Sequence, residues 1–158
     1  FMGVQTVLTR EDDRSLHGES AKSIRQQKRE DLVYRLTFTM EQERPIYVGI
    51  HQNFFKNLSS RGTQTFYSQN HEGSKALATV MQHTVVSLLQ KENKRVPSKS
   101  PPGVFLLKQL TCPAVIVECG FLSNPEEEML LISPDYQNKM AYTLAAGILS
   151  LTEEVFIE

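Results

Sequence analysis

The sequence has no tryptophan, only two cysteines and almost no net charge: 17 Lys and Arg stand against 18 Asp and Glu in 158 residues. Nucleic acid is excluded as the main partner, because neutralising phosphates takes a basic surface. No apolar run approaches the ~20 residues that span a bilayer, and no charged-then-apolar leader opens the chain. With 40% hydrophobic residues, the chain is too apolar to be disordered. We therefore expect one soluble folded domain.

The two cysteines are not expected to form a disulfide. The residues between Cys112 and Cys119 are typical of a strand, and an extended strand would hold the two Cα atoms roughly 20 Å apart. A disulfide needs a Cα separation of about 4.4–6.8 Å. We predict two free thiols, which leaves the cellular compartment open.

Short apolar runs alternate along the chain with segments of helical periodicity. The apolar runs predict strands at residues 4–9, 46–50, 63–67, 104–107 and 114–117. Spacings of three and four predict helices at about residues 20–40 and 74–88, and further helices that begin near residues 125 and 134. The alternation is typical of a single α/β layered domain, with a mostly parallel central sheet and helices on both faces.

Two of the apolar strands run directly into an ionisable residue at the same expected edge of the sheet. Residues 46–50 lead into His51, and residues 114–117 lead into Glu118. In open α/β sheets the ligand site lies at the carboxyl ends of the strands. A lone strand-end histidine is well explained by a bond to a backbone carbonyl, but a carboxylate there is costly to bury unless it is paired, titrates upward or faces a metal or water. Together the two residues favour a hydrolytic site, with His51 as metal ligand and Glu118 as the base that activates water.

Cys119 supports a different reading of the same edge, in which its thiol is the nucleophile and His51 the base. Strand alternation, however, sends Cys119 to the face opposite Glu118. Asn53 and Gln64 are candidates for lining a substrate groove, although each is equally typical of a turn or a sheet. The other histidines lack metal-ligand spacing with His51 and are expected on the surface or on a helix face: His17, His71 and His83.

Five segments carry a family pattern when they are taken in order: VLTREDD (7–13), KREDL (28–32), VGIHQN (48–53), GTQTFY (62–67) and PAVIVECGFLSN (113–124). They resemble the zinc-dependent N-acetylmuramoyl-L-alanine amidases (amidase type 3). The likeness is strongest to the spore-cortex, germination-specific branch of endospore-forming bacteria, and it covers nearly the whole chain.

The resemblance implies a peptidoglycan hydrolase that cleaves the amide between the lactyl group of N-acetylmuramic acid and L-alanine of the stem peptide. In the family the residue that matches His51 binds zinc, and the one that matches Glu118 is catalytic. Zinc would lower the pKa of a water molecule to about 7 and polarise the scissile carbonyl. An extracytoplasmic location, in the cell wall or the forespore intermembrane space, and control by a regulatory protein partner are also implied.

The sequence departs from the family pattern at its start. The family has a second zinc histidine in a His-Gly-Gly loop and a zinc glutamate on its first helix, and neither has a counterpart here. We therefore expect residues 1–158 to be an amidase catalytic domain that lacks its N-terminal strand and helix, with the other ligands and a signal segment upstream of Phe1. The alternative is a cell-wall binding or regulatory module without catalysis.

Overall fold

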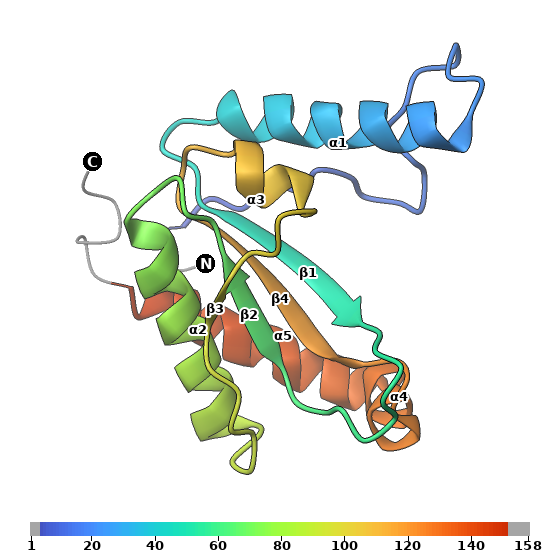
Figure 1. The fold of residues 1–158 in the computed structure, drawn as a ribbon. Coiled ribbons are helices and arrows are strands. Elements are labelled where there is room, and N and C mark those ends of the chain that lie inside the picture. The colour runs from blue at the N-terminus through green and yellow to red at the C-terminus, as the bar shows by residue number, and fades with distance from the viewer. Residues whose placement is uncertain (1–3, 152–158) are drawn as a thin grey trace.

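The computed structural model describes residues 4–151 and shows a layered α/β domain around a four-stranded sheet (Figure 1). The strands are β1 (Tyr47–Asn53), β2 (Gln64–Tyr67), β3 (Ser98–Lys99) and β4 (Ala114–Phe121). The helices are α1 (Ile24–Met40), α2 (Gly73–Leu88), α3 (Phe105–Gln109), α4 (Pro125–Leu131) and α5 (Pro134–Leu149). No helix in this part of the chain is long and apolar enough to cross a membrane.

The strand order is β1-β4-β2-β3. β1 pairs with β4 in parallel, and so does β2 with β3, whereas β2 and β4 are antiparallel. The sheet is therefore mixed but mostly parallel, and the α/β class predicted from the sequence is confirmed. β4 is the central element, because it carries the β1 pairing on one side and the β2 pairing on the other.

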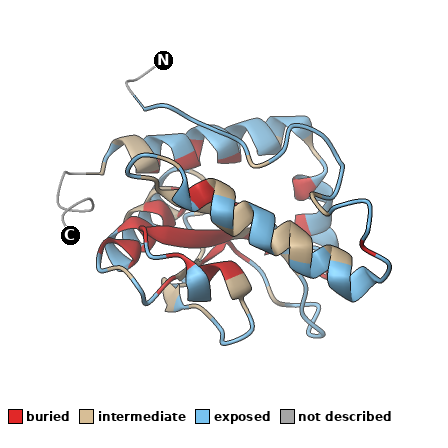
Figure 2. Cartoon of the chain, turned by 90° about the horizontal axis from the view of Figure 1, so that it is seen from above, coloured by how far each residue is buried: buried red, intermediate tan, exposed pale blue. Residues whose placement is uncertain are grey.

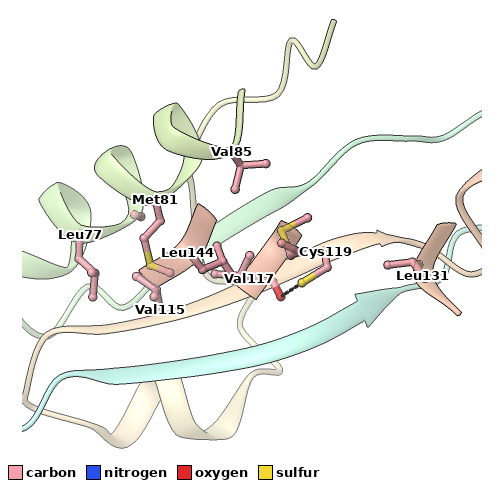
Figure 3. Close-up of a cluster of buried hydrophobic side chains, with 10 residues drawn as sticks. Leu77, Met81, Val85, Val115, Val117, Cys119, Leu131 and Leu144 are labelled. Carbon is pink, nitrogen blue, oxygen red and sulfur yellow. Dashed lines mark hydrogen bonds between the residues drawn. The ribbon is translucent and has the colours of Figure 1, made fainter. Parts of the chain in front are cut away.

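Both faces of β4 are buried, as its continuous apolar run predicts. Val115, Val117 and Cys119 face α2 and α5 and form the larger core with the leucines and methionines of those helices (Figure 3). Ala114 and Ile116 face the opposite way and pack under α3 and α1. Cys112 and Cys119 are both buried and free, which agrees with the predicted absence of a disulfide.

α1 is a peripheral helix, largely exposed along its length (Figure 2). Ser23 caps it by accepting a hydrogen bond from the Gln26 amide at 3.2 Å. The predicted apolar stripe packs against the domain only in its middle, where Leu32 and Leu36 are half-buried against the core under α3, whereas the Ile24 side chain at one end of the helix is 84% exposed.

Two predicted strands are wrong. Residues 4–9 form no strand; their apolar side chains are exposed, and the segment is tied to α1 by a hydrogen bond from Arg35 to Thr9 Oγ1 at 2.8 Å. Residues 104–107 lie at the start of α3, with Leu106 and Leu107 both buried. An apolar run of four residues does not distinguish a strand from a buried helical turn, and here helix is the outcome.

The pairing of β1 with β4 changes register where the two strands end. His51 is opposite Glu118, but Asn53 is opposite Phe121, so one extra residue of β4 lies between the two pairs. This is a β-bulge, a feature often found beside functional sites. Because the extra residue shifts the alternation, Phe121 returns to the face of the sheet that carries Glu118.

Candidate active site

A row of three polar residues crosses the sheet near the carboxyl ends of β1 and β4. Glu118 of β4 is opposite His51 of β1 on one side and opposite Gln64 of β2 on the other. Neighbouring strands lie about 4.8 Å apart, so the three residues are adjacent. We call His51, Glu118 and Gln64 the polar row. It continues the face on which Ile116 and Phe66 pack under α3.

Glu118 is the member of the polar row that has a buried side-chain oxygen without a hydrogen bond in residues 4–151. Its Oε2 atom is buried and has no hydrogen-bond partner among the described residues. Burial raises the pKa of its carboxyl group above the ordinary value of 4.5, because the charged form loses hydration. A carboxyl group of this kind favours taking up a proton, which is the property required of a general base.

His51 is exposed at the edge strand, and no hydrogen bond joins its ring to another residue between 4 and 151. Partial burial lowers the pKa of its imidazole, and the positive charge of Arg35 lowers it further. Both effects favour the neutral ring at physiological pH, which is the form that binds metals.

The two candidate groove residues are already engaged within the chain. The Gln64 side chain is buried; its amide donates to the Val96 carbonyl, and its Oε1 accepts from Arg95 Nη1 at 3.4 Å. Asn53 Oδ1 accepts the amide of the next residue, Phe54, at 2.8 Å. Gln64 therefore joins the sheet to the 93–98 segment.

The donor set in residues 4–151 fits zinc only in part. A neutral imidazole and a carboxyl oxygen without a partner are suitable neighbours for the ion, but structural and catalytic zinc sites use three or four protein ligands. The described residues contain no group of three or more His, Cys, Asp or Glu residues that could hold a metal. His51 would therefore hold zinc only together with ligands from outside this range.

Cys119 lies on the opposite face of β4 from the polar row. Its side chain is 4% exposed and belongs to the core between α2 and α5 (Figure 3). Burial, with the nearby charge of Glu118, raises the pKa of its thiol to about 12. These properties argue against a nucleophilic thiolate at this site.

The remaining histidines have local contacts only. The His71 ring accepts the Gly73 amide at 3.0 Å before α2, and the His17 ring lies 2.9 Å from the Gly18 carbonyl. His83 is exposed on α2. None of them joins the polar row, in agreement with the surface and helix-face roles predicted for them.

A second carboxyl group near the end of β4 was missed by the sequence reasoning. Glu127 of α4 is buried; its Oε2 accepts the Phe121 amide at 2.8 Å, and its Oε1 accepts the Gly62 amide at 2.8 Å. Asn124 caps α4 by accepting from the Glu126 and Glu127 amides and donates to the Ser60 carbonyl. We call Glu127 and its two amide donors the Glu127 brace. It joins the end of β4 to the chain entering β2.

Arg95 was also missed. Its guanidinium lies over the Phe121 ring, 4.6 Å from the centroid, and its Nε donates to the Arg61 carbonyl at 2.7 Å. With the contact to Gln64, three groups fix the guanidinium beside the polar row. Sequence offers no local signal for it, because Arg95 and Gln64 are far apart along the chain.

The fold is a layered α/β domain with a polar row near the carboxyl ends of β1 and β4, an arrangement that suits a hydrolase, and comparison with known proteins specifies the family. A family model described as N-acetylmuramoyl-L-alanine amidase matches residues 2–150. The chain belongs to this family, whose members are generally zinc-dependent cell-wall hydrolases.

Individual relatives agree with the family match. The germination-specific N-acetylmuramoyl-L-alanine amidase of Bacillus subtilis is 33% identical over 147 residues, which cover 93% of this chain and 61% of the relative. The CwlD amidase of Clostridioides difficile, solved in complex with the GerS lipoprotein, is 38% identical with a TM-score of 0.84; the match covers 90% of this chain and 72% of that one. The catalytic domain of CwlV from Bacillus (Paenibacillus) polymyxa is 29% identical with a TM-score of 0.70, and the match covers 91% and 70% of the two chains.

Proposed function

We propose that this protein hydrolyses the amide between the lactyl group of N-acetylmuramic acid and L-alanine of the peptidoglycan stem peptide, in the maturation of the spore cortex. The chain spans 61% of the length of the Bacillus subtilis relative, so we propose this activity for the protein with its complete natural sequence. The observation that carries the proposal is the pairing of His51 with Glu118, whose Oε2 atom is buried and unbonded, within a chain of the amidase family.

In the proposed reaction Glu118 is the general base. Its carboxylate removes a proton from water as the oxygen attacks the lactyl carbonyl carbon, and the protonated carboxyl group then gives that proton to the nitrogen of L-alanine as the amide bond breaks. The raised pKa suits both steps, because the group must hold the proton between them. The products are a muramic acid carboxylate and a free stem peptide.

His51 is the proposed zinc ligand from this chain. When bound, zinc supplies Lewis acidity, which makes water more acidic and polarises a carbonyl group. The other ligands are proposed to come from residues outside 4–151. The neutral ring of His51 and its position opposite Glu118 on the neighbouring strand support this proposal.

Location and partner are proposed from the relatives. Peptidoglycan lies outside the cytoplasmic membrane, so we place the protein there, with a signal segment upstream of Phe1. The Clostridioides difficile relative was solved with a lipoprotein, and we propose a regulatory protein partner for this protein as well.

The test is release of stem peptide from muramoyl peptides by the protein with its complete natural sequence, together with its zinc content. We expect one zinc per chain and a rate that falls 10²–10⁴-fold, the usual contribution of a general base, in Glu118→Ala. Full activity of that variant would refute the assignment. Retention on cell wall without zinc or stem-peptide release would instead support the binding module considered from the sequence.

A further inference from the structure

We propose that Arg95 binds a free carboxylate of the stem peptide close to the scissile amide, and so selects substrates that carry a negative charge at that position. The inference rests on the proposed function, because it takes the substrate class from it. It goes further by naming a group of the substrate and the residue that recognises it.

The first observation is that the Arg95 guanidinium is fixed in place but not neutralised. Phe121 supports its flat face, and the Arg61 carbonyl and Gln64 Oε1 each take one N–H group. A guanidinium carries five N–H donors, so most of its donors remain available. The ion pairs found in residues 4–151 involve other cations, and none of them contains Arg95.

The second observation is that the groups holding Arg95 belong to the edge that carries Glu118. Gln64 is the β2 neighbour of Glu118, and Phe121 is returned to the same face by the bulge in β4. Gln64 is buried and is oriented by its amide bond to the Val96 carbonyl, so its oxygen points to the guanidinium.

The position of Arg95 fits the size of a stem peptide. One strand spacing, about 4.8 Å, separates Gln64 from Glu118, and Arg95 lies one hydrogen bond beyond Gln64. An extended peptide advances about 3.3–3.6 Å per residue, so a carboxylate on the residue after L-alanine reaches this region when the scissile amide lies at Glu118. A guanidinium binds a carboxylate through two parallel N–H bonds, which favours this group over a neutral amide.

The experiment compares two ligands that differ at this group alone: N-acetylmuramoyl-L-alanyl-D-glutamic acid and the corresponding D-isoglutamine compound, which has a carboxamide. Dissociation constants are measured by NMR titration with a chelator present, so that neither ligand is cleaved, and cleavage of both ligands without the chelator is followed in parallel. We expect the natural protein to bind the acid about tenfold more tightly, in line with one hydrogen bond to a charged group. Arg95→Met should reduce this ratio to near one, and Arg95→Lys should leave a smaller preference.

Arg61→Met is the matched control. Its side chain is exposed and pairs with Glu126, so the change removes a nearby positive charge while leaving the carbonyl that holds Arg95. The tenfold preference should persist in this variant. Equal affinity of the natural protein for both ligands, no binding of either ligand, or a preference that survives in Arg95→Met would each overturn the inference. Preferential binding of the acid without cleavage would support Arg95 as the binding residue and count against the proposed hydrolysis instead.

Discussion

Glu118 of β4 and Glu127 of α4 are close together in the sequence, yet the structure surrounds their carboxyl groups in opposite ways. Glu118 lies in the polar row with one buried oxygen that has no hydrogen-bond partner in residues 4–151. Both oxygens of Glu127 accept a backbone amide, one from Phe121 and one from Gly62. Glu118 therefore keeps an oxygen without a hydrogen bond to the described part of the chain, whereas both oxygens of Glu127 are engaged in holding two segments of the chain together.

With the role proposed for Glu118, this contrast separates the reacting group from its structural support within a single segment of the sequence. The strand part brings Glu118 to the edge of the sheet, and the following loop and helix hold that edge in position. Gly120 shows how closely the two parts fit, because a Cβ atom there would lie 3.3 Å from Leu131 and 3.4 Å from Glu127. Substitutions in the two parts should therefore affect different measurements.

The largest expected effect on stability is that of Glu127→Gln. The amide has one oxygen where the carboxylate has two, so one of the two buried backbone amides loses its acceptor and faces an NH₂ group. We expect the free energy of unfolding to fall by about 1–3 kcal/mol, measured by urea denaturation.

Glu126→Gln is the control for Glu127→Gln. The Glu126 side chain is 76% exposed, and its ion pair with Arg61 spans 3.4 Å between two exposed groups. Such exposed ion pairs contribute little to stability, so the free energy of unfolding should change by no more than about 0.5 kcal/mol. An equal urea midpoint for the two variants would show that the Glu127 brace does not stabilise the fold.

Sequence reasoning proposed Glu118 and His51 as site residues because each follows an apolar run, a signal carried by neighbouring residues. It missed Glu127, which stands among three consecutive acidic residues that look alike in sequence; only the fold shows that one of them is buried. Arg95 was missed for a similar reason, since its contacts join segments that are distant along the chain.

The fold was predictable where periodicity extends over many residues and less so where it is short. The long helices α2 and α5 and the central strand β4 were found. Residues 104–107 were misassigned because four apolar residues fit a strand or a helical turn, and residues 4–9 because a strand also needs a pairing partner, which the sequence does not reveal. The antiparallel pairing of β2 with β4 likewise depends on tertiary contacts.

A smaller effect of opposite sign is expected for Glu118→Gln. Burial raises the pKa of Glu118 in the folded state, so at neutral pH the ionised group disfavours folding. The neutral variant should be as stable as the natural protein or slightly more stable, by less than about 1 kcal/mol, because a buried neutral amide costs less than a buried charge.

The raised pKa of Glu118 also predicts how the stability difference between the natural protein and Glu118→Gln depends on pH. As pH falls through the raised pKa of the folded state towards the ordinary value of 4.5, the folded natural protein takes up a proton before the unfolded chain does. Its stability therefore rises relative to that of Glu118→Gln, and the difference should shrink on acidification. Urea denaturation at several pH values, with a chelator present, measures this. A variant that is clearly less stable at neutral pH would show that Glu118 is held by contacts like those of Glu127.

The smallest expected effect concerns Cys119, which adjoins Glu118 in sequence but lies on the other face of the sheet. Its side chain is 4% exposed among core residues, and the pKa of its thiol is about 12, so almost no thiolate is present near neutral pH. Iodoacetamide should neither alkylate Cys119 in the folded protein nor change the release of stem peptide, whereas a chelator should abolish release. Full labelling in urea is the control for reagent reactivity. Loss of activity that parallels labelling of Cys119 in the folded protein would show that the chemistry lies on the core face of β4 and not on the face that carries Glu118. Resistance to the reagent together with sensitivity to the chelator would restrict chemistry to the face that carries the polar row.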